Sequence, residues 1–148
     1  MNGVIWTAGL SFLPPAISPA PARNEAGRLL CESDLRLRGC GDVFVVGDLA
    51  ALEASPLPAT AQVAFQQAAV VATNLLRSLA GEPLEAFAWK DLGEMLSLGR
   101  GEACLTGMGL TLAGTAAYQV RRLAYLTRLP GRSLQLRVAA GWLADWGA

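Results

Sequence analysis

The 148 residues are 53% hydrophobic and only 16% charged, a composition that excludes a disordered chain and supplies enough apolar surface for one domain with a core. Histidine is absent, which excludes histidine-based acid–base catalysis, Ser-His nucleophiles and histidine-ligated metals within this chain. The formal net charge is zero, but residues 1–111 carry 7 basic and 11 acidic side chains, whereas residues 112–148 carry 5 basic and 1 acidic.

The first part of the chain predicts short strands joined by irregular connections. Residues 4–7 have the pattern of a short strand, and the four prolines within residues 11–24 predict an irregular, extended connection. Residues 27–31 are a plausible second strand, and residues 35–38 alternate in polarity between nearby glycines, which indicates a turn or a brief strand. Residues 43–47 are the clearest strand prediction in the chain, because an apolar run ends there at a glycine.

A long helix is predicted over residues 61–79. Thr60 is a reasonable N-cap, and Gly81 and Pro83 end the helical pattern. The apolar residues that recur at helical spacing are Ala61, Ala64, Phe65, Ala68, Ala72, Leu75, Leu76 and Leu79.

The last third predicts an antiparallel β segment followed by two helices. Short strands with tight turns are expected at 86–89, 94–99, 103–106 and 110–112. Helices are expected over residues 115–129 and 133–146, interrupted at Pro130-Gly131. The sequence therefore predicts an α/β fold with one long helix, an antiparallel β segment and two C-terminal amphipathic helices.

Asp48 is the first candidate for a functional residue. The apolar run before it would deliver its carboxylate to a loop at the C-terminal end of a strand, the edge at which ligands bind in open α/β sheets. Glutamines follow on the helix after Thr60, and this combination suits a hydroxyl-bearing cofactor better than a hydrolytic centre. A loop carboxylate that caps a turn is the simpler alternative.

Several segments, in this order, resemble the C-terminal part of type II NAD(P)H dehydrogenases, single-subunit flavoproteins that reduce quinones. The segments are residues 4–9, 27–29, 43–48, 61–67, 74–75 and 91–99. Residues 91–99, together with 117–126, are most similar to the cyanobacterial and plastid branch. The two G-x-G-x-x-G phosphate-binding motifs of that family are absent from this sequence.

The resemblance implies a domain organisation and a set of cofactor contacts. Residues 1–80 would be the C-terminal part of a Rossmann-like FAD/NAD(P)-binding domain, and residues 81–148 the β segment with membrane-facing helices. Asp48 would hydrogen-bond a ribityl hydroxyl of FAD, and Gly47 would allow close approach of the backbone. Ala61 and Gln62 would lie beside the flavin at the positive end of the helix. The crossover that includes Trp6 would lie near the cofactors, although Trp6 is equally consistent with an ordinary core residue.

The same resemblance places quinone binding on the long helix. Gln62 and Gln66 lie four residues apart on one helical face, and their amides would donate to a quinone carbonyl. A pair of solvated surface glutamines is the alternative. Gln67 points elsewhere on the helix and is the weaker candidate. No catalytic side chain and no metal ligand are predicted.

The C-terminal part, residues 115–146, is the candidate membrane surface. Arg121, Arg122 and Arg128 accompany an apolar face, and Trp142 and Trp146 lie near the end, a combination typical of helices in the lipid interface. Two ordinary helices packed on the body are the alternative. The resemblance implies a peripheral protein on the cytoplasmic face of a bacterial plasma or thylakoid membrane.

The resemblance implies a fragment of a FAD-dependent NAD(P)H:quinone oxidoreductase that passes electrons from NAD(P)H through FAD to a membrane quinone. The alternative is a non-catalytic membrane-binding or interaction module derived from such an enzyme by truncation. The expected partners are a membrane quinone and either a missing N-terminal half or a second copy of the chain, and nucleic acid is not expected. The separate cysteines Cys31, Cys40 and Cys104 favour buried thiols in a reducing compartment over a redox dithiol.

Overall fold

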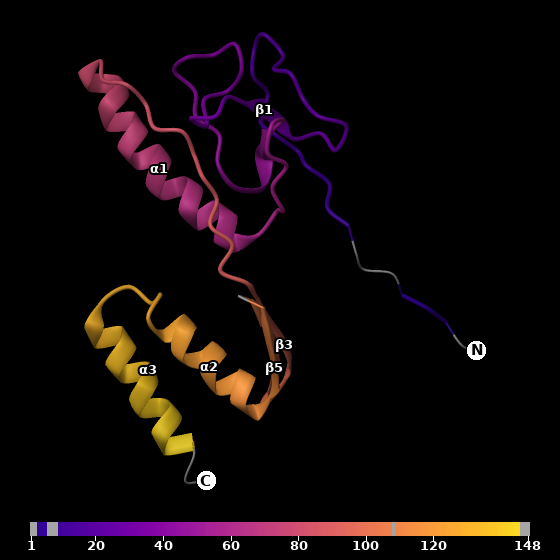
Figure 1. Ribbon diagram of the computed structural model, residues 1–148, viewed down its shortest axis with the longest axis vertical. Coiled ribbons are helices and arrows are strands. Elements are labelled where there is room, and N and C mark those ends of the chain that lie inside the picture. The colour runs from indigo at the N-terminus through magenta and orange to yellow at the C-terminus, as the bar shows by residue number, and fades with distance from the viewer. Residues whose placement is uncertain (1–2, 6–8, 108, 146–148) are drawn as a thin grey trace. The chain divides into compact units, whose positions relative to one another are not determined.

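The computed structural model describes residues 3–5, 9–107 and 109–145, and the chain divides into two compact units, residues 1–90 and 91–148 (Figure 1). Both units combine helices with strands, so the predicted α/β class is confirmed. The predicted strand at residues 4–7 is wrong for Val4 and Ile5, which lie in no strand, and its remaining residues lie outside those described.

The first unit has a small parallel sheet and one long helix. Its elements are β1 (Leu29–Cys31), the short 3-10 helix η1 (Gly47–Leu49), β2 (Ala50–Leu52) and α1 (Ala61–Ala80). Strands β1 and β2 pair in parallel, with Leu29 opposite Ala50. The side chains that form the core of this unit are Leu29, Cys31, Leu37, Val45 and Ala50. The predicted strand at 27–31 is thus confirmed in its second half.

The strand predicted at residues 43–47 is wrong. Phe44 makes a single isolated bridge to Arg36, and the chain then enters η1 at Gly47. The backbone of this segment is instead satisfied by the turn before it, because Val45 N–H donates to the Leu35 carbonyl at 3.0 Å. An apolar run becomes a strand only where a neighbouring strand can pair with it. Here β1 pairs instead with β2, which comes later in the chain.

Helix α1 begins and ends where the sequence predicts. The Thr60 hydroxyl accepts a hydrogen bond from Val63 N–H, and Gly81 closes the helix in the left-handed conformation with φ 71°. The face that packs on the unit is unexpected: it consists of Val63, Gln67, Val71 and Asn74. Most of the predicted apolar residues lie on the other side, where Phe65, Leu76 and Leu79 are 73%, 71% and 86% exposed. Helix α1 therefore presents an apolar face to solvent.

Residues 82–90 run back along α1 in extended conformation and form no strand, so the strand predicted at 86–89 is wrong (Figure 1). Side chains of the helix replace a strand partner. The Asn74 amide donates to the Glu85 carbonyl at 2.9 Å and accepts from Glu85 N–H at 2.8 Å. Arg77 donates to the Pro83 carbonyl and forms an ion pair with the Glu85 carboxylate at 2.7 Å. We call residues 82–90 the return segment.

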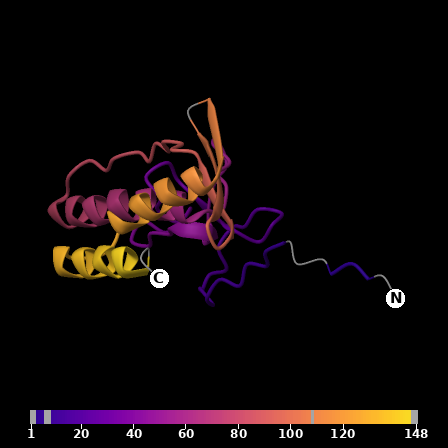
Figure 2. The ribbon, with the colours of Figure 1, turned by 90° about the horizontal axis from the view of Figure 1, so that it is seen from below.

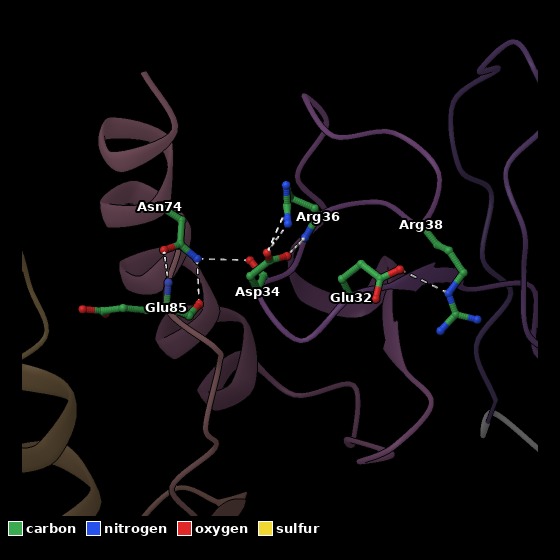
Figure 3. Close-up of polar contacts among 6 residues, drawn as sticks. All are labelled: Glu32, Asp34, Arg36, Arg38, Asn74 and Glu85. Carbon is green, nitrogen blue, oxygen red and sulfur yellow. Dashed lines mark hydrogen bonds and ion pairs between the residues drawn. The ribbon is translucent and has the colours of Figure 1, made fainter. Parts of the chain in front are cut away.

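Asn74 also joins the return segment to the loop after β1. Its amide donates to the Asp34 carbonyl at 3.2 Å, and Figure 3 shows it lying between Asp34 and Glu85. The Asp34 carboxylate accepts from the Arg36 backbone N–H at 3.0 Å and from its guanidinium at 2.9 Å. Partial burial opposes ionisation of Asp34, but the hydrogen bonds and charge of Arg36 outweigh it and lower the pKa of the carboxyl.

Acid is expected to weaken the first unit through Asp34. Because its folded-state pKa lies below its ordinary value of 3.8, the carboxylate contributes fully to stability above that value, and the contribution is lost as pH falls through the lower folded pKa. Asp34→Asn should be less stable than wild type near neutral pH, with the difference shrinking as pH falls below 3.8. Urea unfolding from about pH 5 downwards measures it. A difference that stays constant with pH would show that ionisation of Asp34 contributes nothing.

The second unit is a three-stranded antiparallel meander followed by two helices. Its elements are β3 (Glu94–Gly99), β4 (Glu102–Gly107), β5 (Leu110–Gly114), α2 (Thr115–Leu126) and α3 (Arg132–Asp145). These agree with the predicted strands after residue 90 and with the predicted pair of helices. Helix α2 packs on the sheet, where Ala103 and Ala117 are fully buried.

Helices α2 and α3 lie side by side within this unit (Figure 2). The Arg122 guanidinium stacks 4.1 Å from the Trp142 ring and 5.6 Å from the Tyr118 ring. Leucines on the same two helices stay exposed, among them Leu123, Leu136 and Leu143. No helix in the described ranges is both long and apolar enough to cross a membrane.

Candidate functional site

The candidate site is built on the turn formed by η1. Gly47 has φ +70°, a left-handed conformation that glycine adopts without strain. Its backbone N–H donates to the Gln67 side-chain oxygen at 2.6 Å, and a Cβ built on Gly47 would lie 3.5 Å from the Ala64 Cβ. The turn therefore packs on the first half of α1, in agreement with the predicted proximity of Gly47-Asp48 to the helix that follows.

Asp48 lies in this turn with its side chain exposed. Its backbone carbonyl accepts from Arg28 Nε at 2.8 Å. The same guanidinium donates to the carbonyls of Leu57, at 2.9 Å, and Ala50, so Arg28 ties the turn to β2 and to the loop that leads into α1. The backbone of Asp48 is thus fixed, while its carboxylate is open to a partner from outside the chain.

Gln62 and Gln66 lie together on α1, as predicted, but both bind the return segment. Gln66 donates to the Lys90 carbonyl at 2.9 Å and accepts from Lys90 N–H at 3.0 Å. The Gln62 oxygen accepts from the Trp89 indole N–H at 3.2 Å. Both glutamines are half-buried. They are neither simple solvated residues nor amides fully available to a ligand.

Gln67, the weaker candidate by sequence, is the glutamine closest to the turn. It is 0% exposed and contributes its oxygen to Gly47 N–H. A sequence signal existed: Gln67 lies four residues from each of Val63 and Val71, in the middle of the buried stripe. Arg28 carried no signal, because its partners lie 20 to 29 residues further along the chain.

The cysteines and acidic groups add no second site. In the ranges that the structure describes, no three Cys, Asp or Glu side chains gather as metal ligands would. Cys31 is buried, and burial raises the pKa of its thiol. Cys40 and Cys104 are only half-buried, so the expectation of buried thiols holds fully for Cys31 alone. Ala61 is exposed at the first position of α1, and Trp6 and Trp146 lie outside the described residues.

An exposed carboxylate thus lies on a glycine-containing turn that packs against a glutamine-bearing helix. No protein-family model matches the chain. Several curated proteins match it, among them the three named next. It is 40% identical over 97% of its length to the demethylphylloquinone reductase NdbB of Synechocystis sp. and 36% identical over 95% to the alternative NAD(P)H-ubiquinone oxidoreductase C1 of Arabidopsis thaliana. It is 38% identical over 67% to a type II NADH:quinone oxidoreductase of Staphylococcus aureus.

The chain is therefore a homologue of type II NAD(P)H:quinone oxidoreductases, and the resemblance stated from the sequence is confirmed. It matches the C-terminal part of these relatives. It spans 37% of the length of the Synechocystis protein, 29% of the Arabidopsis protein and 26% of the Staphylococcus protein.

Proposed function

We propose that this chain supplies part of the FAD- and quinone-binding region of an NAD(P)H:quinone oxidoreductase and acts together with the part of its relatives' fold that these 148 residues do not cover. The names of all three relatives support a quinone-reducing activity, and those of the Arabidopsis and Staphylococcus proteins support NAD(P)H or NADH as the reductant. The observation that carries the proposal is the Gly47–Leu49 turn, which holds the Asp48 backbone rigidly and leaves its carboxylate open.

FAD fits the donors and acceptors of this turn. The Asp48 carboxylate would accept from a ribityl hydroxyl, a charge-assisted bond worth about 1.5–3 kcal/mol. Gly47 carries no side chain towards the ligand, and Ala61 leaves the positive end of α1 open to an electron-rich ring. When bound, FAD would supply the redox chemistry, taking a hydride from NAD(P)H and passing electrons to a quinone. The chain would bind and orient it.

Gln62 and Gln66 would contribute to the quinone side. The Gln66 amide uses one of its two N–H groups on the Lys90 carbonyl, and the second is the donor that a quinone carbonyl would take. The bonds of Gln62 and Gln66 to Trp89 and Lys90 would then fix the orientation of the amides in advance.

The second unit would bind the membrane surface. Its exposed leucines and stacked arginines lie on adjacent helices, and none of the described ion pairs neutralises Arg121, Arg122 or Arg128. Such a surface is suited to apolar burial combined with anionic headgroups, which add about 1 kcal/mol per basic residue. These features also support the second candidate function, a non-catalytic membrane-binding module.

The deciding experiment measures flavin in the purified chain, alone and with a separately produced polypeptide equivalent to the uncovered part of the Synechocystis relative. We expect one FAD per chain in the mixture and NAD(P)H oxidation that depends on added quinone. Co-sedimentation with vesicles of anionic or neutral lipid is measured in parallel. Membrane binding with no flavin in either sample would replace the proposal with the non-catalytic module. The absence of both flavin binding and membrane binding would exclude both candidate functions.

A further inference from the structure

Two side chains from different elements bind the backbone of the Gly47–Leu49 turn. From α1, the Gln67 oxygen accepts the Gly47 N–H at 2.6 Å. Arg28 is the residue before β1, and its guanidinium donates to the Asp48 carbonyl at 2.8 Å and to the Leu57 carbonyl at 2.9 Å. Both side chains bind backbone groups, so together they set where the turn lies.

Burying the polar amide of Gln67 costs free energy that only its hydrogen bond to the turn offsets. It is 0% exposed in a stripe whose neighbours are Val63 and Val71, and its amide nitrogen has no partner among the described residues. An aliphatic side chain would fill that space without burying an unpaired amide group. What the glutamine alone supplies is an acceptor for Gly47 N–H, the first donor of η1, which has no partner within the short helix itself.

Arg28 cannot be replaced by another cation in this geometry. Its rigid, planar guanidinium donates three hydrogen bonds, to the carbonyls of Asp48, Ala50 and Leu57. A lysine ammonium is a compact charge on a flexible stem and does not reproduce that fork. Arg28 therefore fixes the turn and also the loop that leads to Thr60.

We propose that Gln67 and Arg28 are positioning residues that fix the Gly47–Leu49 turn and through it place the Asp48 carboxylate for the ribityl chain of FAD. The second half of this inference rests on the proposed function. The first half concerns the turn itself and is measurable without any ligand.

The experiment compares Gln67→Met and Arg28→Lys with the wild-type chain. Amide hydrogen exchange by NMR reports on the turn through Gly47 N–H and through Ala50 N–H, which donates to the Gly47 carbonyl. FAD affinity is measured by fluorescence titration for each variant, with and without Asp48→Ala. Val71→Ala is the matched control, because it loosens the same buried face of α1 without removing a hydrogen bond to the turn.

Gln67→Met should raise the amide exchange rate of Gly47 about tenfold. Val71→Ala should raise the exchange rate of Gly47 no more than it raises the rates of the amides in α1. Each positioning variant should weaken FAD binding about tenfold when Asp48 is present and less than about twofold when it is absent. Unchanged exchange at Gly47 and Ala50, or an equal loss of affinity with and without Asp48, would overturn the inference. If the wild type binds no FAD in any sample, the proposed function fails, and exchange alone decides whether Gln67 and Arg28 hold the turn.

Discussion

Replacing Asn74 with leucine should lower the free energy of unfolding by about 3 kcal/mol, the largest single effect expected in this chain. Asn74 is 0% exposed, and its amide makes three hydrogen bonds to the backbones of Asp34 and Glu85 (Figure 3). Leucine has a similar size but offers no polar atom. The Glu85 N–H and two carbonyls would then be left without partners in a buried or half-buried place, which is the costly way to lose a hydrogen bond.

Urea unfolding followed by circular dichroism measures this loss. Thr73→Ala is the matched control: it lies next to Asn74 on α1 but is exposed, and its hydroxyl binds only the Ala69 carbonyl of the same helix. The control should change stability by no more than about 0.5 kcal/mol. If Asn74→Leu were as mild as the control, the return segment would not depend on this amide for its attachment to α1.

Replacing Asp48 with alanine should reduce FAD affinity by about tenfold to a hundredfold while leaving the fold unchanged. The affinity would fall because a charge-assisted acceptor for a hydroxyl is lost. The fold would persist because the side chain is exposed and the residue is held through its backbone carbonyl. Asp48→Asn should fall between the two, since an amide oxygen still accepts but carries no charge.

Fluorescence titration with FAD, under the conditions in which the wild type binds it, measures the effect. Asp42→Ala is the matched control, because Asp42 is an exposed carboxylate in the preceding turn of the same unit. Its removal should not change affinity. A chain that binds FAD equally well with and without the Asp48 carboxylate would remove this residue from the cofactor site and leave the simpler interpretation, an ordinary surface carboxylate.

Local signals predicted the fold where local interactions determine it. Thr60 and Gly81 mark the ends of α1 because capping depends on a few neighbouring residues, and the glycines after residue 92 mark the turns of the meander. Sheet membership was not predictable in the same way. Residues 43–47 have the composition of a strand, but the turn before them already binds their backbone, and this depends on how distant segments come together.

The candidate site divides along the same line. Asp48, which stays a prediction, was selected because a carboxylate directly after an apolar run and a glycine is a short-range pattern. Arg28 was not selected and Gln67 was only the weaker candidate, because each lies 20 residues from the turn that it binds. The buried face of α1 could not be predicted from its apolar pattern. The largest apolar residues, Phe65, Leu76 and Leu79, are exposed, whereas the buried side consists of two valines and two amides. Pattern alone cannot tell which side of a helix will find its partner in the same chain.

The reversal at Gly81 determines where the polypeptide leaves its first unit. Because the return segment runs back along α1, the backbone of Lys90 is hydrogen-bonded to Gln66. This is the half of the helix against which the Gly47–Leu49 turn packs. A chain leaving from the far end of α1 would start about 21 Å away, at 1.5 Å per residue. The first unit therefore ends at Lys90 beside the first half of α1 and not at the far end of the helix.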